Sequence, residues 1–469
     1  QQYLPDLMEK EAEVFGPRTI SGFLSQVGAE EAMTSDQVVW SEQGRLHLSY
    51  KGKVSSATGG LNSSSQILIQ SDIDGADSNT SGISTGGTGT EHGIRPNDTI
   101  IISDATNGIV KAVVTKVATD TIDFSPYGTD TLSTTANLAT TILVYGSEFS
   151  KGTTYTNEAG TAASDTRKAN EPRFKSFTNK PIILKDYYEV SGSDASRIGW
   201  VEVSGEAGQS GYLWYLKAEA DTRARFTDYI EMSMLESELS AADGSNTLLD
   251  ANTTILSHTG AYGTEGLFAA IEDRGNVTTG VTGVNAATDL AEFDAILAEF
   301  DSQGAIEENM LFVNRATSLA FDDMLASMNS YGAGGTSYGV FQNDEDMALN
   351  LGFSGFRRGS YDFYKSDFRY LNDKATRGSI NDANAANAIR GVIIPAGVST
   401  VYDQTLGRNI KRPFLHVRYR ASQTDDRRMK TWTTGSVGAA TSALDAMQIH
   451  MLSERCLITQ GANNFMLMK

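Results

Sequence analysis

One stretch of this chain, residues 171–239, limits its fold more than any other, because two extended segments there lead into one long amphipathic helix. Residues 212–242 contain neither proline nor glycine, and their apolar side chains recur on one face with the period of a helix. At 1.5 Å per residue, a helix over about residues 210–241 is a rod of roughly 45 Å. Few compact enzymes are built around such a rod.

Two β-strands are predicted immediately before the helix. Residues 173–178 and 182–190 are rich in β-branched and aromatic side chains, and Asn179, Lys180 and Pro181 interrupt them. The second segment alternates only loosely between apolar and polar residues. We therefore expect two extended segments with a break between them.

A β-rich part is also predicted earlier, between about residues 51 and 165, where Gly, Ser, Thr and Asn are frequent and helix signals are few. Asn107 and Gly108 can both adopt positive φ, which is typical of a tight hairpin turn. Short strands are expected at residues 99–103, 109–117, 121–124 and 141–145. This pattern predicts a small β subdomain set in a long excursion of the chain.

The first fifty residues have the character of an arm rather than of a domain. A charged, helical piece is expected at residues 7–13, and extended pieces are expected at residues 37–40 and 45–50. Apolar residues are too scattered here to form a core of their own, so the arm should pack on something else. We therefore expect that deletion of residues 1–50 leaves the fold intact.

The region after the long helix combines helices and strands. A helix over about residues 290–300 is expected to end at Gly304, and a second helix is predicted after Thr317. Strands are expected at residues 310–314, 361–365, 388–395, 414–421 and 446–452. The whole chain is therefore predicted to be an α+β protein.

The composition excludes some classes of function. Lys and Arg number 38 against 58 Asp and Glu, a net charge of −20, so a large basic surface for specific nucleic-acid binding is not expected. The single cysteine, Cys456, allows no intrachain disulfide, and its apolar neighbours predict a small core residue. Neither a signal peptide nor a run of about 18 apolar residues is seen, so no association with a membrane is expected.

The sequence offers few candidates for catalysis. Residues 335–339 match the G-x-S-x-G pattern around Ser337, but the preceding segment is predicted to be a helix rather than a strand, which favours a flexible loop over a nucleophile. The histidines are not spaced as a metal site or a serine triad requires, so packing or surface roles are expected. They are His47, His92, His258, His416 and His450.

Acidic residues likewise favour ordinary roles. Asp72, Asp74 and Asp77 resemble the start of a calcium loop, but their spacing departs from it and no closing glutamate follows, so a polar turn is favoured. Other acidic groups lie in hydrophilic surroundings, where solvated carboxylates are expected. These groups are Glu307–Glu308, Asp322–Asp323 and Asp344–Glu345–Asp346. We predict no catalytic residue, no cofactor-binding residue and no metal ligand, and therefore no enzyme.

The order of these parts resembles one viral family. An arm, a long β excursion, a strand, a rod-like helix and an α/β region with a C-terminal return are similar to the major capsid proteins of tailed double-stranded DNA bacteriophages, with the Hong Kong 97-type fold. Residues 173–192 are similar to the family's E-loop return strand, and residues 227–236 to the second half of its spine helix. Residues 15–24 resemble capsid arms of contractile-tailed phages, including T-even-like marine ones.

The resemblance implies a division of the chain into five parts. These are residues 1–50 as the N-terminal arm, 51–190 as the E-loop with an inserted β subdomain at about 66–150, 191–260 as the peripheral domain with the spine helix, 261–400 as the axial domain, and 401–469 as the C-terminal return of the peripheral domain. The insertion is larger than a minimal E-loop. The family's occasional lysine-to-asparagine cross-link cannot be placed on any residue of this chain.

The resemblance also implies a function. The chain would self-assemble into hexameric and pentameric capsomers of an icosahedral head, which encloses DNA without sequence-specific binding. Vertex, decoration, scaffold and portal proteins would be further partners, and the protein would be a virion component assembled in the cytoplasm of a bacterial host. The family often removes an internal scaffold segment by cleavage during maturation, and the start at Gln1 rather than methionine fits such a cleavage.

Physical arguments favour the same function. Arms and loops without cores of their own must bury apolar faces between subunits, where many weak contacts add up as a shell closes. An acidic wall repels DNA phosphates, so packed DNA can move and leave. Two alternatives stay open: a secreted or surface β-rich adhesin or glycan-binding protein, whose residues 60–160 would bind on their own, and a serine hydrolase that uses Ser337.

Overall fold

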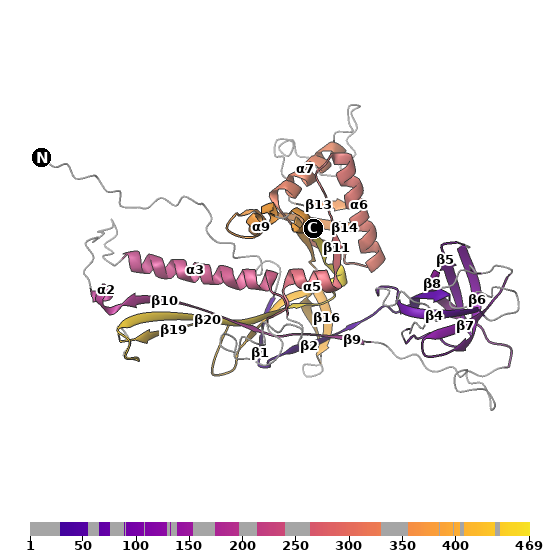
Figure 1. Ribbon diagram of the computed structural model, residues 1–469, viewed down its shortest axis with the longest axis horizontal. Coiled ribbons are helices and arrows are strands. Elements are labelled where there is room, and N and C mark those ends of the chain that lie inside the picture. Colours follow the sequence, from indigo (N-terminus) through magenta and orange to yellow (C-terminus); the bar gives the residue numbers. More distant parts are fainter. Residues whose placement is uncertain are drawn as a thin grey trace. The chain divides into compact units, whose positions relative to one another are not determined.

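The chain divides into two compact units: Ser41–Lys175 forms one, and Gln1–Trp40 together with Ser176–Lys469 forms the other. Figure 1 shows the elements of each unit in a computed structural model. The residues that the structure describes are 29–54, 65–75, 89, 91–106, 108–128, 132, 138–152, 174–196, 213–239, 263–329, 355–383, 385–396, 398–403, 408–436 and 441–469.

The unit Ser41–Lys175 is built on a closed, antiparallel β-barrel. Its described strands are β3 (Ser49–Val54), β4 (Ser65–Asp72), β5 (Asp98–Asp104), β6 (Gly108–Val117), β7 (Thr121–Pro126) and β8 (Ala139–Ser147). Around the barrel the order is β3, β4, β7, β6, β5 and β8, and β8 closes the barrel because it pairs with both β5 and β3.

Part of this barrel is predicted from the sequence and part is not. The four expected strands between residues 99 and 145 are confirmed as β5 to β8. Gly108 has a φ of +88°, as the predicted hairpin turn requires, whereas Asn107 lies outside the described residues. Strand β4 has no counterpart among the predicted strands, and β3 lies mostly beyond the extended piece expected at residues 45–50.

The barrel has a hydrophobic core of its own. Phe124, Ile67, Ile100 and other large apolar side chains are fully buried inside it. At Gly52 a Cβ atom would lie 2.7 Å from the Cγ2 atom of Ile67, so the close approach of strands β3 and β4 requires glycine there. The barrel therefore buries its apolar side chains without a neighbouring subunit.

The other unit contains a sheet centred on the long strand β20 (Ala446–Thr459). Strand β10 (Ile182–Ser191) pairs antiparallel with one edge of β20, and β18 (Leu415–Arg420) and β19 (Lys430–Gly435) pair antiparallel with the other edge. Strand β1 (Ala29–Met33) adds to β18 in parallel. Exposure alternates regularly along β10, so the alternation expected to be loose is strict in the folded chain.

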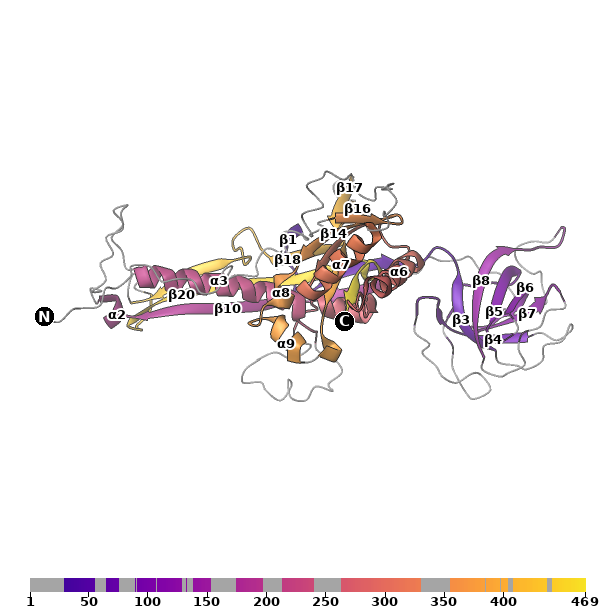
Figure 2. The ribbon, with the colours of Figure 1, turned by 90° about the horizontal axis from the view of Figure 1, so that it is seen from above.

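The long helix α3 (Leu213–Glu236) lies along β10 and β20, as Figures 1 and 2 show. Its side chains Phe226 and Ile230 are buried against Leu184 of β10 and Met451 of β20. The predicted rod is confirmed over 24 residues, about 36 Å at the helical rise. Helix α3 therefore covers one face of the sheet. Among the described residues, no helix is both long and apolar enough to cross a membrane.

A second, mixed sheet lies in the same unit. Its described strands, in order across the sheet, are β11 (Asn276–Thr278), β21 (Met466–Met468), β15 (Gly391–Pro395), β12 (Glu308–Val313), β14 (Tyr361–Asp367) and β13 (Gly355–Arg358). Strands β12 and β14 are parallel, whereas β15 runs antiparallel to β12. A buried aromatic cluster fills the side of this sheet that faces two helices.

These two helices are α6 (Ala286–Gln303) and α7 (Arg315–Asn329). Phe293 of α6 packs its ring 5.4 Å from that of Phe321 in α7. Helix α6 begins after Asn285, whose side chain accepts a hydrogen bond from the Thr288 amide, and it ends at Gly304, whose φ is +65°. The predicted end of this helix is therefore confirmed.

The other described elements are short. They are β2 (Val38–Gln43) paired with β9 (Phe174–Asn179), β16 (Val398–Asp403) paired with β17 (Arg408–Pro413), the helices α2 (Gly192–Ser196), α5 (Leu267–Arg274), α8 (Arg369–Asn372) and α9 (Arg377–Ala383), and the 3-10 turns η4 (Ala385–Asn387) and η5 (Ala462–Asn464). Together with the two sheets and the barrel, they confirm the predicted α+β class.

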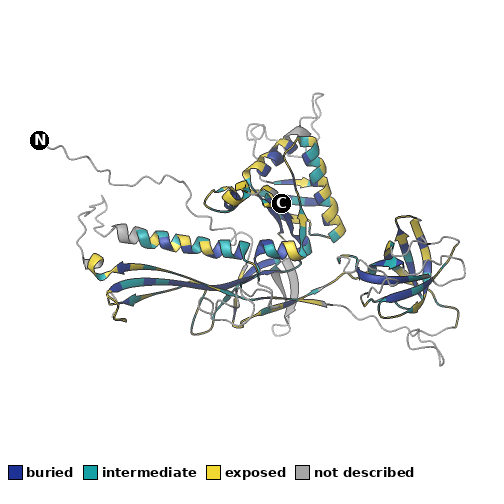
Figure 3. Ribbon diagram, viewed as in Figure 1, coloured by how far each residue is buried: buried dark blue, intermediate teal, exposed yellow. Residues whose placement is uncertain are grey.

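Buried residues follow the strands of the barrel and of both sheets (Figure 3). The first strands belong to this framework, because Met33 and Trp40 pack with Cys456 and Tyr50 lies in the barrel core. Deletion of residues 1–50 would remove these side chains, so the expectation that the fold survives that deletion is wrong. A deletion that keeps every described strand ends at residue 28. The five-part division of the chain stays a prediction.

Candidate assembly surfaces

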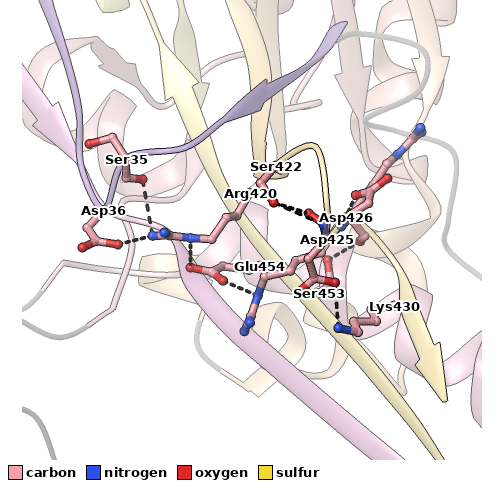
Figure 4. A network of polar contacts seen from close by, with 11 residues as sticks. Ser35, Asp36, Arg420, Ser422, Asp425, Asp426, Lys430, Ser453 and Glu454 are labelled. Atoms are coloured by element: carbon pink, nitrogen blue, oxygen red, sulfur yellow. Dashed lines mark hydrogen bonds and ion pairs between the residues drawn. The ribbon is translucent and has the colours of Figure 1, made fainter. Parts of the chain in front are cut away.

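A network of charged side chains fastens the N-terminal strand to the C-terminal strands (Figure 4). The Arg420 guanidinium donates from Nε to Glu454 Oε1 at 2.6 Å and also pairs with Asp36 in the loop after β1. Arg427 contacts the second oxygen of the same glutamate, with Nε 2.6 Å from Oε2. Because the Glu454 side chain is only 6% exposed, two guanidinium groups neutralise a nearly buried carboxylate.

Two glutamates of β1 itself complete the attachment. Glu31 pairs with Arg418 at 2.9 Å, and Glu30 pairs with Arg455 at 3.0 Å and with Arg428. Burial lowers the pKa of the Arg455 guanidinium, and the charge of Glu30 opposes this change. Strand β1 is therefore held by ion pairs and backbone hydrogen bonds more than by apolar burial, and it places residue 29 at the edge of the sheet.

A second attachment holds the pair β2 and β9. Trp40 and Phe177 lie with their ring centroids 6.1 Å apart, and the Arg274 guanidinium lies 4.6 Å from the Phe177 centroid and 5.5 Å from that of Trp40. Arg274 Nη2 also lies 2.6 Å from Glu265 Oε2. A cation that stacks on aromatic rings and also pairs with a carboxylate makes this a favourable joint.

Asn179, predicted only as part of a strand break, is the polar centre of this joint. It is fully buried, and its Nδ2 donates to the Leu457 carbonyl at 2.6 Å. Its Oδ1 accepts from the Glu265 amide at 2.9 Å and from Thr264 Oγ1 at 3.1 Å. The hydrogen bonds of Asn179 therefore fix the backbone at the break between β9 and β10. An asparagine among strand-forming residues was the available sequence signal.

The face of the β20 sheet opposite α3 carries a row of aromatic rings. Tyr187 of β10, His450 of β20 and Trp432 of β19 lie opposite one another in the strand register. The ring of His450 stacks at 6.0 Å on Tyr187 and at 5.2 Å on Trp432, and its Nε2 lies 2.7 Å from Thr434 Oγ1. We call Tyr187, His450 and Trp432 the aromatic ladder.

The aromatic ladder is exposed at Tyr187, whereas His450 and Trp432 are half-buried. The Tyr187 side chain is 56% exposed, and Ile183 on the same face is 46% exposed. Further along β20, Cys456 on that same face is covered by Trp40 and Phe177. The face is therefore covered at Cys456 and exposed at Tyr187 and Ile183, and exposed apolar side chains that lie together mark interaction surfaces.

The structure does not gather the candidate histidines into one site. His47 is exposed, His92 is half-buried, and His416 is buried with Nδ1 3.3 Å from the Pro413 carbonyl. His450 belongs to the aromatic ladder, and His258 lies outside the described residues. Within the described parts of the chain, no group of three or more histidine, cysteine or acidic side chains is placed to hold a metal ion.

The other candidates are also dispersed. Ser337, Asp77 and the acidic group at residues 344–346 lie outside the described residues. Asp74 pairs with Arg45 at 2.6 Å.

The Asp322 carboxylate is the exception to the expected solvation of acidic groups, because it forms a nearly buried ion pair with Lys365. Asp322 differs from the other acidic groups because strand β14 places Lys365 beneath helix α7, next to its carboxylate. The core role predicted for Cys456 is confirmed, and burial raises the pKa of its thiol to about 12.

Comparison with known proteins finds likeness in structure alone. No protein-family model matches the chain, and no curated protein matches it. A solved structure from Microbacterium phage Oxtober96 is similar over 99% of this chain and 95% of that chain, with 8% identity and a TM-score of 0.37.

Two further structures are similar over about two thirds of this chain. One, from Mycobacterium phage Ogopogo, has 13% identity and a TM-score of 0.33 over 67% of this chain and 83% of that chain. The other, the asymmetric unit of the bacteriophage PhiM1 mature capsid, has 8% identity and a TM-score of 0.31 over 66% of this chain and 78% of that chain. The structures to which this chain is similar thus include phage proteins, one of them from a mature capsid.

Proposed function

We propose that this chain is a structural protein of a phage head, the major capsid protein, and not an enzyme. It would assemble with copies of itself into hexamers and pentamers of an icosahedral shell that encloses double-stranded DNA. The observation that carries the proposal is the exposure of Tyr187 and Ile183 on one face of the β20 sheet, whose other face is covered by α3, with Phe226 and Ile230 buried. A monomer gains nothing from such exposed apolar side chains, whereas a subunit would bury them against its neighbour.

The parts have natural roles in a Hong Kong 97-type subunit. Helix α3 and the β20 sheet would form the peripheral domain, and the sheet packed against α6 and α7 would form the axial domain. The barrel would be the insertion of the E-loop, and residues 1–28 would be the free part of the arm. Membership of a T-even-like or marine contractile-tailed group is the narrower form of this proposal, supported by the resemblance of residues 15–24.

Charge supports a container for DNA. A net charge of −20 repels phosphates, so the wall would not retain the packed genome. Decoration, vertex, scaffold and portal proteins would be additional partners in the virion. Each of these partners would bind to a shell made of many copies of this chain. Such a shell is held together by many modest contacts between copies rather than by a few strong ones.

The proposal is tested by assembly of the purified chain, followed by light scattering and electron microscopy. We expect closed shells or capsomers from the full-length chain. A chain that starts at residue 29 keeps all described strands, so we expect it to retain the melting temperature of the subunit but to lose assembly. A full-length chain that stays monomeric under every condition of salt, crowding and concentration would contradict the proposal.

One observation favours the adhesin alternative, namely the self-sufficient core of the barrel. A module with its own core can bind a ligand without the rest of the chain. The fragment Ser41–Lys175 should then bind glycans on an array, whereas a capsid insertion should not. The hydrolase alternative rests on Ser337, and loss of turnover in Ser337→Ala would be its test.

A further inference from the structure

The outside of the barrel carries an apolar surface over β8, β5 and β6, which are neighbours in that order. Leu143 of β8 and Lys111 of β6 both lie opposite Ile101 of β5. Ile101 is half-buried, Leu143 is 39% exposed, and Tyr145 and Ile109 on the same strands are 51% and 62% exposed. Their neighbours along each strand fill the core, so these side chains point outwards. They are therefore not needed for the core of the barrel.

Two further residues extend this surface. The Tyr127 hydroxyl donates a hydrogen bond to Glu148, which follows β8. Partial burial, this hydrogen bond and the nearby Tyr145 together raise the pKa of Tyr127 to about 12, yet its side chain is 50% exposed. The hydrogen bond thus holds an exposed ring in place. We call the apolar residues of this surface, namely Ile101, Ile109, Tyr127, Leu143 and Tyr145, the barrel face.

The barrel face has one charge of each sign at its sides. Lys111 lies on β6 and Glu148 lies beyond the end of β8, so β5 runs between them. Both residues are exposed, and neither has an ion-pair partner among the residues that the structure describes. In a two-fold contact a residue i of one copy meets j of the other, and j meets i. An apolar surface flanked in this way is therefore complementary to itself.

The barrel unit is also the part of the chain that is least opposed to contact with its equal. Residues 41–175 contain 11 Lys and Arg against 14 Asp and Glu, a net charge of −3, whereas the whole chain carries −20. Copies of like charge repel one another, and the repulsion grows with the charge on each of the two surfaces. An almost neutral unit with exposed aromatic and aliphatic side chains is thus suited to bind a second copy of itself.

We propose that the barrel face of one copy binds the barrel face of a second copy across a two-fold axis, with Lys111 of each copy paired with Glu148 of the other. The inference rests on the proposed function for the presence of many copies, and it gives the barrel a role in their association. A two-fold contact joins copies in pairs and does not propagate. It therefore adds links between copies whose rings are closed by other surfaces.

The test exploits the inert native cysteine. Cys456 is buried with a raised pKa, so a cysteine added at the surface is the one that reacts. Full-length Lys111→Cys is mixed with full-length Glu148→Cys under assembly conditions and oxidised mildly. Linked chains are then counted on denaturing gels, and the joined peptides are identified by mass spectrometry. We expect about tenfold more linked chains in the mixture than in either variant alone, because a disulfide needs the two Cβ atoms within about 4.5 Å.

The matched control places the same two cysteines on the other side of the barrel. Lys53→Cys on β3 is mixed with Asp123→Cys on β7, and β4 lies between these two strands. We expect no more linked chains in this mixture than in either control variant alone. Equal linking of the control pair and the Lys111 and Glu148 pair would show random collision and would overturn the inference.

Absence of the Lys111 to Glu148 link, or the same amount of linked chain in each variant alone, would also overturn the inference. Electron microscopy of the same samples separates it from the proposed function. Shells without this link refute the inference alone. Linked pairs that form no shell under any condition refute the proposed shell alone.

Exchange of the two charges gives a second measurement. Lys111→Glu and Glu148→Lys should each raise the protein concentration needed for half-association by about tenfold, because each brings like charges together. The double variant restores opposite charges, so we expect a concentration within about twofold of that of the original chain. Analytical ultracentrifugation measures the association, and thermal melting shows that each variant is folded. A double variant that associates as weakly as the single variants would refute the inference.

Discussion

Glu30 accepts a hydrogen bond from Arg455 at 3.0 Å, although 425 residues separate them in the chain. The Arg455 side chain is only 10% exposed, so loss of Glu30 removes the carboxylate that pairs with a nearly buried cation. This pair ties β1 to β20, and the pairs of Glu31 and Asp36 tie β1 and the loop after it to β18.

Glu30→Gln should lower the free energy of unfolding by about 2–3 kcal/mol, because it removes the negative charge but keeps the shape of the side chain. Chemical denaturation monitored by circular dichroism measures the change. Glu219→Gln is the matched control, since its 3.1 Å pair with Arg223 lies on the surface of α3 and should contribute at most about 0.5 kcal/mol. Equal losses in the two variants would contradict the role of the buried pair.

Tyr361 makes the stability of the folded protein depend on pH in the alkaline range. Its hydroxyl donates to Asp301 Oδ1 at 2.8 Å, and burial first and this hydrogen bond second raise its pKa to about 12. The unfolded chain loses that proton near pH 10, while the folded chain keeps it. The contribution of Tyr361 is therefore complete below about pH 10 and is lost as the pH rises towards 12.

We expect Tyr361→Phe to flatten the fall of the unfolding free energy over that pH range, measured by urea denaturation at several alkaline pH values. Tyr364→Phe provides the control, because Tyr364 on the same strand is exposed. An unchanged slope in Tyr361→Phe would show that its hydroxyl does not govern the alkaline response.

The barrel should fold without the rest of the chain. The fragment Ser41–Lys175 contains its whole core, so we expect a single cooperative thermal transition. Phe124→Ala should cost about 3–5 kcal/mol, because the ring is fully buried. Ile109→Ala, at a position 62% exposed, should change the unfolding free energy by less than about 0.5 kcal/mol. A fragment that melts without cooperativity would refute this autonomy.

The joint at Arg274 depends on a planar cation. Arg274→Lys keeps the charge but loses the stack on Phe177, so we expect a loss of about 1–2 kcal/mol in calorimetric unfolding. Arg225→Lys is the control, because Arg225 is more than half exposed and lies 3.9 Å from Asp186. Equal losses of unfolding free energy in the two variants would show that the stacking does not stabilise the protein.

Local patterns predicted the elements whose stabilising contacts are themselves local. The rod α3 follows from helical periodicity, and the end of α6 follows from Gly304, which needs only positive φ. Strands β5 to β8 follow from turn residues and β-branched runs. In each case the deciding physics lies within about twenty residues.

Contacts between distant residues were out of reach for the same reason. Closure of the barrel depends on pairing of residues 49–53 with 139–143. The sequence around either segment does not indicate this pairing. The aromatic ladder joins Tyr187, Trp432 and His450 from three separate strands, and the regular alternation of β10 was visible only in the folded sheet. Asp322 is predicted from the sequence to be solvated, but it is nearly buried because it pairs with Lys365, 43 residues away.

The pairing of β10 with β20 has a consequence for synthesis on the ribosome. Ser191 of β10 pairs with Ala446 of β20. More than half of the polypeptide must therefore be synthesised after β10 before its partner strand β20 is available. All strands of the barrel, by contrast, have been made once residue 147 has left the ribosome. The barrel can therefore fold early, while the nascent β10 keeps an open edge and a bare tyrosine. That waiting period is when a chaperone is most needed.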